Sequence, residues 1–143
     1  MSCRKTELHF NLSATTYLIN ELTTNRANYD DILDKFDFYI VPLLNPDGIH
    51  FSQLRPEDGG RRYWRKNRRK NEGNSAGKPE CDGVDLNRNF DFQWDGKASN
   101  PNICGTNYRG ASGFSEPETQ AVRDFIMKGK SDGVKWNVFV SKQ

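Results

Sequence analysis

The sequence has little of what membrane anchors and histidine-rich metal sites are made from. Histidine occurs only twice, at His9 and His50. No apolar run approaches the roughly 18 residues that a membrane-spanning helix needs, so the sequence predicts no membrane partner. Residues 1–7 lack the apolar stretch of a secretory signal peptide, and none is expected in this chain.

Apolar residues are scarce as well. Counted with glycine and without tyrosine, they make up roughly 39% of the chain, below the usual range of about 45–50%. A chain of 143 residues is long enough for one domain. Its composition nevertheless predicts a thin core, which suits a piece of a larger domain better than a complete one.

Cysteine is limited to three residues, so one stays unpaired if the other two form a bridge. A disulfide between Cys81 and Cys104 would close a loop worth on the order of 3 kcal/mol in the chain-entropy model. Such a bridge would indicate an oxidising compartment. Residue types alone leave two free thiols as an equal alternative.

The net charge of +2 conceals an uneven distribution. Residues 61–70 carry seven basic side chains and no acidic one, whereas acidic residues outnumber basic ones in the rest of the chain. A local excess of positive charge predicts an anionic partner at this place. Tyr63 and Trp64 lie within the run, so nucleic-acid binding is one alternative.

Periodicity and turn residues divide the chain into expected elements. A helix is expected at 13–24, with Ser13 as its N-cap. A second helix is expected to open with a capping box of Ser115 and Glu118 and to stop at Gly129. The other expected elements are a helical turn at 30–35, strands at 37–44 and 134–141, a turn at 45–48, and long loops at 55–82 and 91–114. The order of elements predicts an α/β fold with functional loops.

Asn87 and Arg88 stand side by side where an apolar alternation changes to polar residues. The arginine side chain is a permanently charged planar fork that matches a carboxylate with two parallel hydrogen bonds. The asparagine amide adds another donor to the same anion. The pair therefore indicates a site that grips a free carboxylate.

Four motifs occur in an order that is typical of one protein family. They are Phe-Tyr-Ile-Val-Pro at 38–42 followed by Asn-Pro-Asp-Gly at 45–48, Tyr-Trp-Arg-Lys at 63–66, Gly-Val-Asp-Leu-Asn-Arg-Asn-Phe at 83–90, and the segment 108–119 with Phe-Ser-Glu-Pro-Glu-Thr at its end. Together they resemble the zinc metallocarboxypeptidases related to pancreatic carboxypeptidases A and B. The resemblance implies an α/β fold containing part of a mixed central sheet flanked by helices, with long irregular loops.

The resemblance also implies roles for single residues. Asn87 and Arg88 would bind the C-terminal carboxylate of a peptide or protein, and Arg65 would stabilise the oxyanion of the tetrahedral intermediate. Cys81 and Cys104 occupy the positions of a family disulfide. The family reaction is the zinc-dependent hydrolysis of C-terminal amino acids from peptides, usually in the secretory pathway or outside the cell.

The zinc ligands of the family have no counterpart in this chain. The positions that match the family's His-x-x-Glu pair carry Lys5 and Leu8, and the position of the later histidine carries Gln143. Zinc needs deprotonated nitrogen, oxygen or sulfur ligands, so no metal is expected at the family site. The family's general-base glutamate would also lie outside this sequence. We interpret residues 1–12 as a divergent segment and 13–143 as a partial carboxypeptidase-like domain.

Three functional hypotheses follow. In the first, the chain is a partial metallocarboxypeptidase that is inactive in isolation. In the second, it is a non-catalytic isoform that binds peptide C-termini or a partner. In the third, the run at 61–70 binds nucleic acid, which we disfavour because the family motif explains the same residues. The sequence leaves the oligomeric state open.

Overall fold

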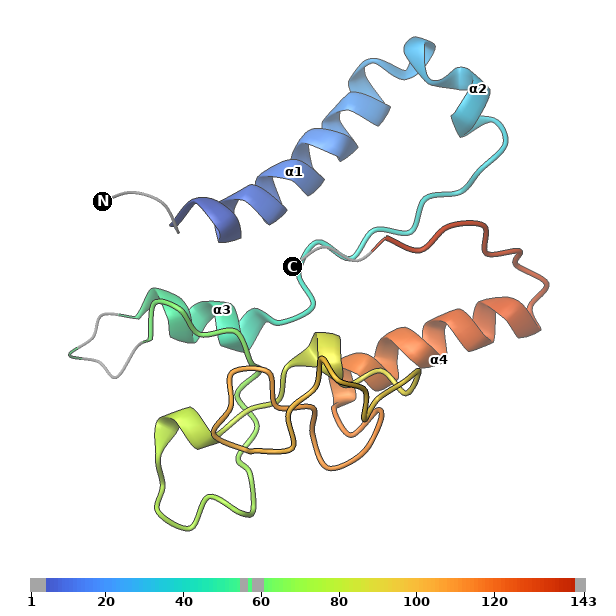
Figure 1. Ribbon diagram of the computed structural model, residues 1–143. Coiled ribbons are helices and arrows are strands. Elements are labelled where there is room, and N and C mark those ends of the chain that lie inside the picture. Colours follow the sequence, from blue (N-terminus) through green and yellow to red (C-terminus); the bar gives the residue numbers. More distant parts are fainter. Residues whose placement is uncertain (1–4, 55–56, 58–60, 141–143) are drawn as a thin grey trace. The chain divides into compact units, whose positions relative to one another are not determined.

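The computed structural model describes residues 5–54, 57 and 61–140, and for 5–12 it describes the backbone alone (Figure 1). The chain divides into two compact units at Leu44 and Asn45. The first unit contains α1 (Lys5–Thr24), η1 (Arg26–Asn28) and α2 (Asp30–Leu33). The second contains α3 (Pro46–Gln53), η3 (Pro79–Cys81), η4 (Leu86–Arg88) and α4 (Pro117–Ser131).

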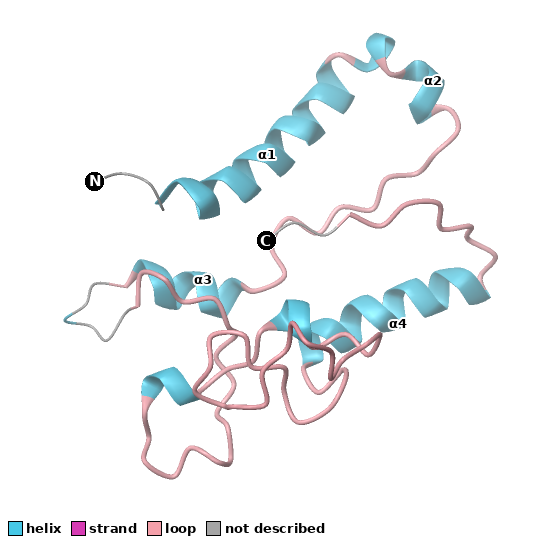
Figure 2. Cartoon of the chain, in the orientation of Figure 1, coloured by secondary structure: helices cyan, strands magenta, loops and turns pink. Residues whose placement is uncertain are grey.

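The predicted α/β fold with part of a mixed sheet is wrong for the part of the chain that the structure describes, which has helices and loops but no strand (Figure 2). Within the described ranges, the one β-type pairing is an isolated parallel bridge between Asn100 and Tyr108. The segments 37–44 and 134–140 are non-helical chain whose side chains are mostly exposed. Val41 is 65% and Val138 is 78% exposed. A strand needs a neighbour to pair its backbone groups, and neither segment has one among the described residues.

The helix predicted at 13–24 is confirmed in type, but α1 begins earlier, at Lys5. Ser13 is therefore an interior residue and not the N-cap. The helical turn predicted at 30–35 is confirmed as α2. None of the described helices is long and apolar enough to cross a membrane.

The turn predicted at 45–48 is wrong, because these residues open α3. The Asn45 side chain accepts a hydrogen bond from the Gly48 N–H at 3.0 Å, and Pro46 occupies the first turn, where its missing N–H costs nothing. The Asn45 amide also donates to the carbonyl of Lys66 at 3.1 Å. A Cβ at Gly48 would lie 2.5 Å from that carbonyl oxygen, so only glycine fits.

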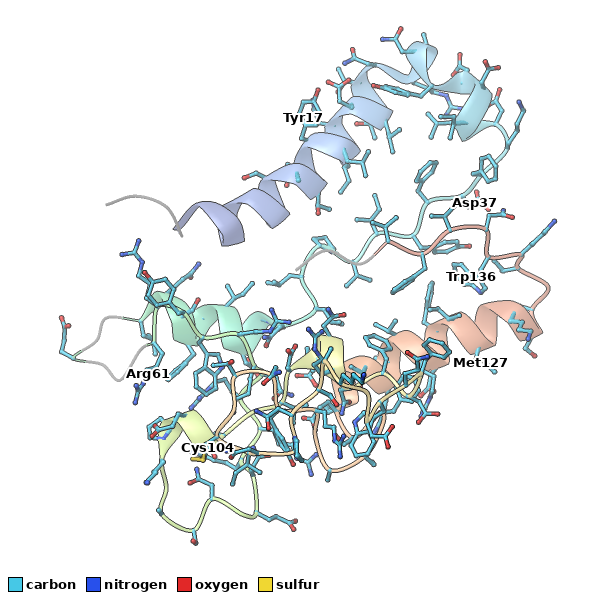
Figure 3. All side chains as sticks on the ribbon, in the orientation of Figure 1. Tyr17, Asp37, Arg61, Cys104, Met127 and Trp136 are labelled. Carbon is cyan, nitrogen blue, oxygen red and sulfur yellow. A yellow bond between two sulfur atoms is a disulfide. The ribbon has the colours of Figure 1, made fainter. Side chains whose placement is uncertain are left out.

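The predicted C-terminal helix is confirmed as α4, but its capping box is wrong. Glu116 is the N-cap and makes no side-chain cap bond, while the Ser115 hydroxyl donates to the Glu116 carboxylate. After α4 the chain turns back at Gly133, whose φ is +89°. The indole of Trp136, labelled in Figure 3, then donates to the Ile126 carbonyl at 3.0 Å.

The interior of the second unit is more polar than apolar. Its buried hydrophobic residues, among those described, are Cys81, Val84, Leu86 and Tyr108. Its buried polar and charged residues are Lys66, Asn67, Asp82, Asp85, Asn89, Glu116 and Thr119. The low apolar content of the sequence thus appears as an interior held by hydrogen bonds.

Candidate functional site

The loop at 81–90, which carries the predicted carboxylate clamp, is buried up to Leu86 and emerges at Asn87. Gly83 has a φ of +78°, and a Cβ there would lie 2.2 Å from the Asn67 carbonyl oxygen. Asp85 then caps η4: its carboxylate accepts from the Asn87 N–H at 3.1 Å. This cap turns Asn87 and Arg88 out of the interior.

The two clamp residues differ in how firmly they are held. Asn87 is exposed, whereas Arg88 is half-buried. The Nε of Arg88 donates to the Ala98 carbonyl at 2.9 Å, and one of its terminal nitrogens donates to the Asn87 carbonyl at 3.2 Å. The guanidinium of Arg88 is therefore anchored to the backbone of Asn87 and Ala98.

Arg65, the predicted oxyanion arginine, is brought to the same loop by Asp85. Its Nε donates to the Asp85 carboxylate at 2.8 Å, and the carboxylate is almost completely buried. One oxygen of Asp85 thus holds Arg65 while the other holds the backbone of Asn87. Asp85 was not predicted as a site residue, although an aspartate is a typical N-cap of a helical turn such as η4.

The disulfide predicted between Cys81 and Cys104 is confirmed (Figure 3). It ties η3 to the loop between Asn100 and Tyr108, the two residues that form the isolated bridge. Next to it, burial alone would raise the pKa of Asp82, but hydrogen bonds from Lys70, Asn74 and the Asn71 backbone lower the pKa below its ordinary value.

A second buried network supports the loop from the side of α4. The Glu116 carboxylate accepts from Asn67 at 2.7 Å and from Arg69 at 2.8 Å. Its hydrogen bond and charge raise the pKa of Arg69. The Asn89 amide donates to the carbonyls of Arg109 and Ser112 and to the Ser115 hydroxyl. Three chain segments distant in sequence, around residues 67–69, 89 and 109–116, are joined in this way.

The basic run at 61–70 is largely engaged within the chain. Its ion pairs are Arg61 with Glu80, Arg65 with Asp85, Arg69 with Glu116 and Lys70 with Asp82. The Arg68 guanidinium lies 3.7 Å from the ring centre of Phe51 and 4.6 Å from that of Trp64. The acidic partners neutralise much of the positive charge that the sequence concentrates at 61–70.

The structure places no group of three or more His, Cys, Asp or Glu side chains suited to a metal ion within the described residues. Of the three positions matched to the family's zinc ligands, Gln143 lies outside the described residues. Lys5 and Leu8 lie in α1, but their side chains are not described.

A family model described as zinc carboxypeptidase matches residues 12–141. The metallocarboxypeptidase A-like protein of Trichophyton verrucosum is 41% identical over 124 residues, which cover 87% of this chain and 26% of that protein. The carboxypeptidase B of Astacus astacus is 40% identical over 116 residues, covering 81% of this chain and 35% of that protein. The chain thus spans about a quarter to a third of the length of these relatives.

Solved structures agree with the sequence matches. The chain is similar to the crystal structure of carboxypeptidase A from Helicoverpa armigera, with a TM-score of 0.67 and 41% identity. That match covers 82% of this chain and 26% of the other. Bovine thrombin-activatable fibrinolysis inhibitor, solved with a tick carboxypeptidase inhibitor, gives a TM-score of 0.64 at 34% identity and covers 82% of this chain and 36% of that one.

Proposed function

The chain belongs to the zinc carboxypeptidase family, and from that premise we propose that its 81–90 loop binds the terminal carboxylate of a peptide or protein. Asn87 would supply amide donors and Arg88 a charged fork. The observation that carries the proposal is the buried Asp85 carboxylate, which links the backbone of Asn87 to Arg65. A site that combines these three donors suits an anionic chain end.

For Arg65 we propose the oxyanion role in a complete enzyme. Its bond to Asp85 uses Nε, which orients the guanidinium plane relative to the clamp loop. Fixed positive charge is most effective in catalysis where negative charge develops in the transition state. Arg65 would meet this demand at the carbonyl next to the terminal residue.

Zinc supplies the family's hydrolytic chemistry by activating water and polarising the scissile carbonyl. The donor set of this chain does not fit that ion, because the matched positions hold a lysine, a leucine and a glutamine. We therefore propose that the 143-residue chain, taken by itself, neither holds zinc at the family position nor hydrolyses peptides. Its remaining function would be to bind peptide C-termini.

Nucleic-acid binding is the weaker alternative, since Arg61, Arg65, Arg69 and Lys70 have acidic partners within the chain. Retention on DNA that weakens steeply with salt would favour it.

The disulfide supports a location in the secretory pathway or outside the cell.

The proposal is tested by titrating the chain with N-acetyl-Ala-Phe and N-acetyl-Ala-Arg, each as the free acid and as the C-terminal amide. At least one acid should bind, and its amide should bind about tenfold more weakly because the charge is lost. Equal binding of acid and amide, or no binding of any probe, would refute the carboxylate clamp.

Replacing Arg88→Met should weaken binding of the acid by about tenfold or more, since a hydrogen bond to a charged group contributes about 1.5–3 kcal/mol. Arg123→Met is the matched control, because Arg123 lies on α4 and pairs with Asp124. The control should bind the acid as the parent chain does.

The predicted inactivity is tested by measuring the zinc content of the chain and its hydrolysis of the same peptides. One bound zinc per chain together with hydrolysis would contradict the prediction.

A further inference from the structure

Lys66 contacts the chain on both sides of the disulfide. Its Nζ donates to the carbonyl of Glu80 at 2.8 Å and to the carbonyl of Ile103 at 2.8 Å. Glu80 directly precedes Cys81, and Ile103 directly precedes Cys104. One ammonium group therefore holds the peptide group that leads into each bridged cysteine.

The environment of Lys66 makes these two bonds strong. The residue is only 2% exposed, and its Nζ lies 5.4 Å from the ring centre of Trp64 and 6.0 Å from that of Tyr108. Burial lowers the pKa of Lys66 to about 8, so it still carries its charge at neutral pH. A buried cation without hydrogen-bond acceptors is very costly, and the two carbonyls supply the acceptors.

We propose that Lys66 is a positioning residue for disulfide formation, which draws the carbonyls of Glu80 and Ile103 together before the sulfurs of Cys81 and Cys104 are joined. Cys81 and Cys104 are 23 residues apart, and bringing them together costs the reduced chain conformational entropy. If the ammonium makes its two bonds in the reduced chain, that cost is met before oxidation. The thiols then face each other at a high effective concentration. This role is independent of carboxylate binding.

The oxidant we assign is a low-molecular-weight disulfide of the glutathione class. The thiolate of one cysteine attacks a sulfur of glutathione disulfide, which forms a mixed disulfide and releases one glutathione thiolate. The thiolate of the second cysteine then attacks the cysteine sulfur of the mixed disulfide and releases the other glutathione. The chain loses two electrons and two protons, and glutathione disulfide is reduced to two thiols.

The proposal predicts a specific change in the thiol–disulfide equilibrium. The equilibrium constant of the Cys81–Cys104 bridge, measured in glutathione redox buffers, should fall about tenfold in Lys66→Met. The matched control is Lys70→Met, because Lys70 is exposed and pairs with Asp82 but is not bonded to either carbonyl. The control should stay within threefold of the parent chain. A fall of less than threefold for Lys66→Met, or an equal fall for both variants, would overturn the proposal.

A second measurement on the unmutated chain decides the matter even if Lys66→Met does not fold. The chain is reduced, exposed briefly to an amine-acetylating reagent, and analysed by mass spectrometry. If Lys66 holds both carbonyls before oxidation, its acetylation in the reduced chain should be at least about tenfold slower than that of Lys70. Equal rates would show that the contacts form only after the disulfide, which overturns the proposal.

Discussion

Asp85 is the residue on which the candidate site most depends. An aspartate can accept with both oxygens, and here one oxygen takes the Arg65 Nε and the other the Asn87 N–H. The carboxylate is 2% exposed, so its two donors substitute for water. Asp85 therefore contributes both to the orientation of Arg65 and to the turn that exposes Asn87.

Asp85→Asn should remove one of these two hydrogen bonds, because an asparagine side chain has a single acceptor oxygen. Either Arg65 or the Asn87 N–H then faces an amide nitrogen. We expect a loss of about 1–2 kcal/mol in the free energy of unfolding, since Arg65 is partly solvated and recovers some hydration. Urea denaturation measures the loss.

The control for Asp85→Asn is Asp132→Asn, at an exposed carboxylate that pairs with Lys128 at the end of α4. Its effect should stay within about 0.5 kcal/mol. Similar losses in the two variants would show that Asp85 is an ordinary surface acid.

The lowered pKa of Lys66 makes the free energy of unfolding depend on pH. Its pKa is lowered from the ordinary 10.5 to about 8, so between these values the unfolded chain binds more protons than the folded one. The free energy of unfolding should therefore rise with pH across this window, by at most about 1.4 kcal/mol per unit, and the contribution is lost as the pH falls through 8. Tyr108, whose pKa burial raises, opposes the rise only above its ordinary value of 10.0.

Urea denaturation of the parent chain and Lys66→Met at several pH values checks this. The curve of free energy against pH should be flatter for the variant between about pH 8 and 10. Parallel curves would mean that Lys66 is not the group that titrates.

Single residues were only partly predictable. Arg65, Asn87 and Arg88 were chosen from sequence, and the structure brings them to one loop, but their roles stay predictions. Asp85 and Glu116 were missed as buried hubs because burial depends on contacts with distant segments. Glu116 was expected only as part of a helix start, yet it accepts from Asn67 and Arg69, more than forty residues away.

At the scale of elements, the first turn of α3 shows how a helix is attached to the site. Asn45 caps the helix and donates to the carbonyls of Arg65 and Lys66. Gly48 lies against the same Lys66 carbonyl. The start of α3 is thus docked on the backbone of Arg65 and Lys66.

Gly48→Ala tests this docking. In an isolated helix alanine would be favoured over glycine by about 1 kcal/mol. Here the added Cβ would lie 2.5 Å from a backbone oxygen, so we expect destabilisation by about 1–3 kcal/mol instead. Gly73→Ala is the control, because its Cβ would meet only the end of the Ile103 side chain, at 3.3 Å. Thermal unfolding compares the two, and a stabilising Gly48→Ala would contradict the model of close docking.

Helices with a clear 3.6-residue period were predictable in type, and their ends were not. α4 follows from its apolar stripe, but Ser115 was assigned to its cap although its hydroxyl bonds within the buried network. α3 was taken for a turn because Pro46 and Gly48 are turn residues. The same proline is also well suited to the first turn of a helix, so local chemistry alone did not decide.

At the scale of the whole molecule, the sheet was the main error. Phe38, Val41 and Val138 have the β-branched and aromatic character of strands, and this local preference is real. A sheet also requires partner strands, which is a property of the whole fold. Among the described residues these segments have no such partners, and the side chains of Phe38, Val41 and Val138 remain exposed.

The polar interior of the second unit has a thermal consequence. Exposing apolar surface raises the heat capacity of unfolding, whereas exposing polar surface lowers it. Buried asparagine, aspartate and glutamate side chains contribute heavily here, so the heat capacity change per residue should lie below the usual value of about 12–15 cal/mol/K. The free energy of unfolding of this unit would then change little with temperature. Cooling would lower it less than in a domain with a hydrophobic core.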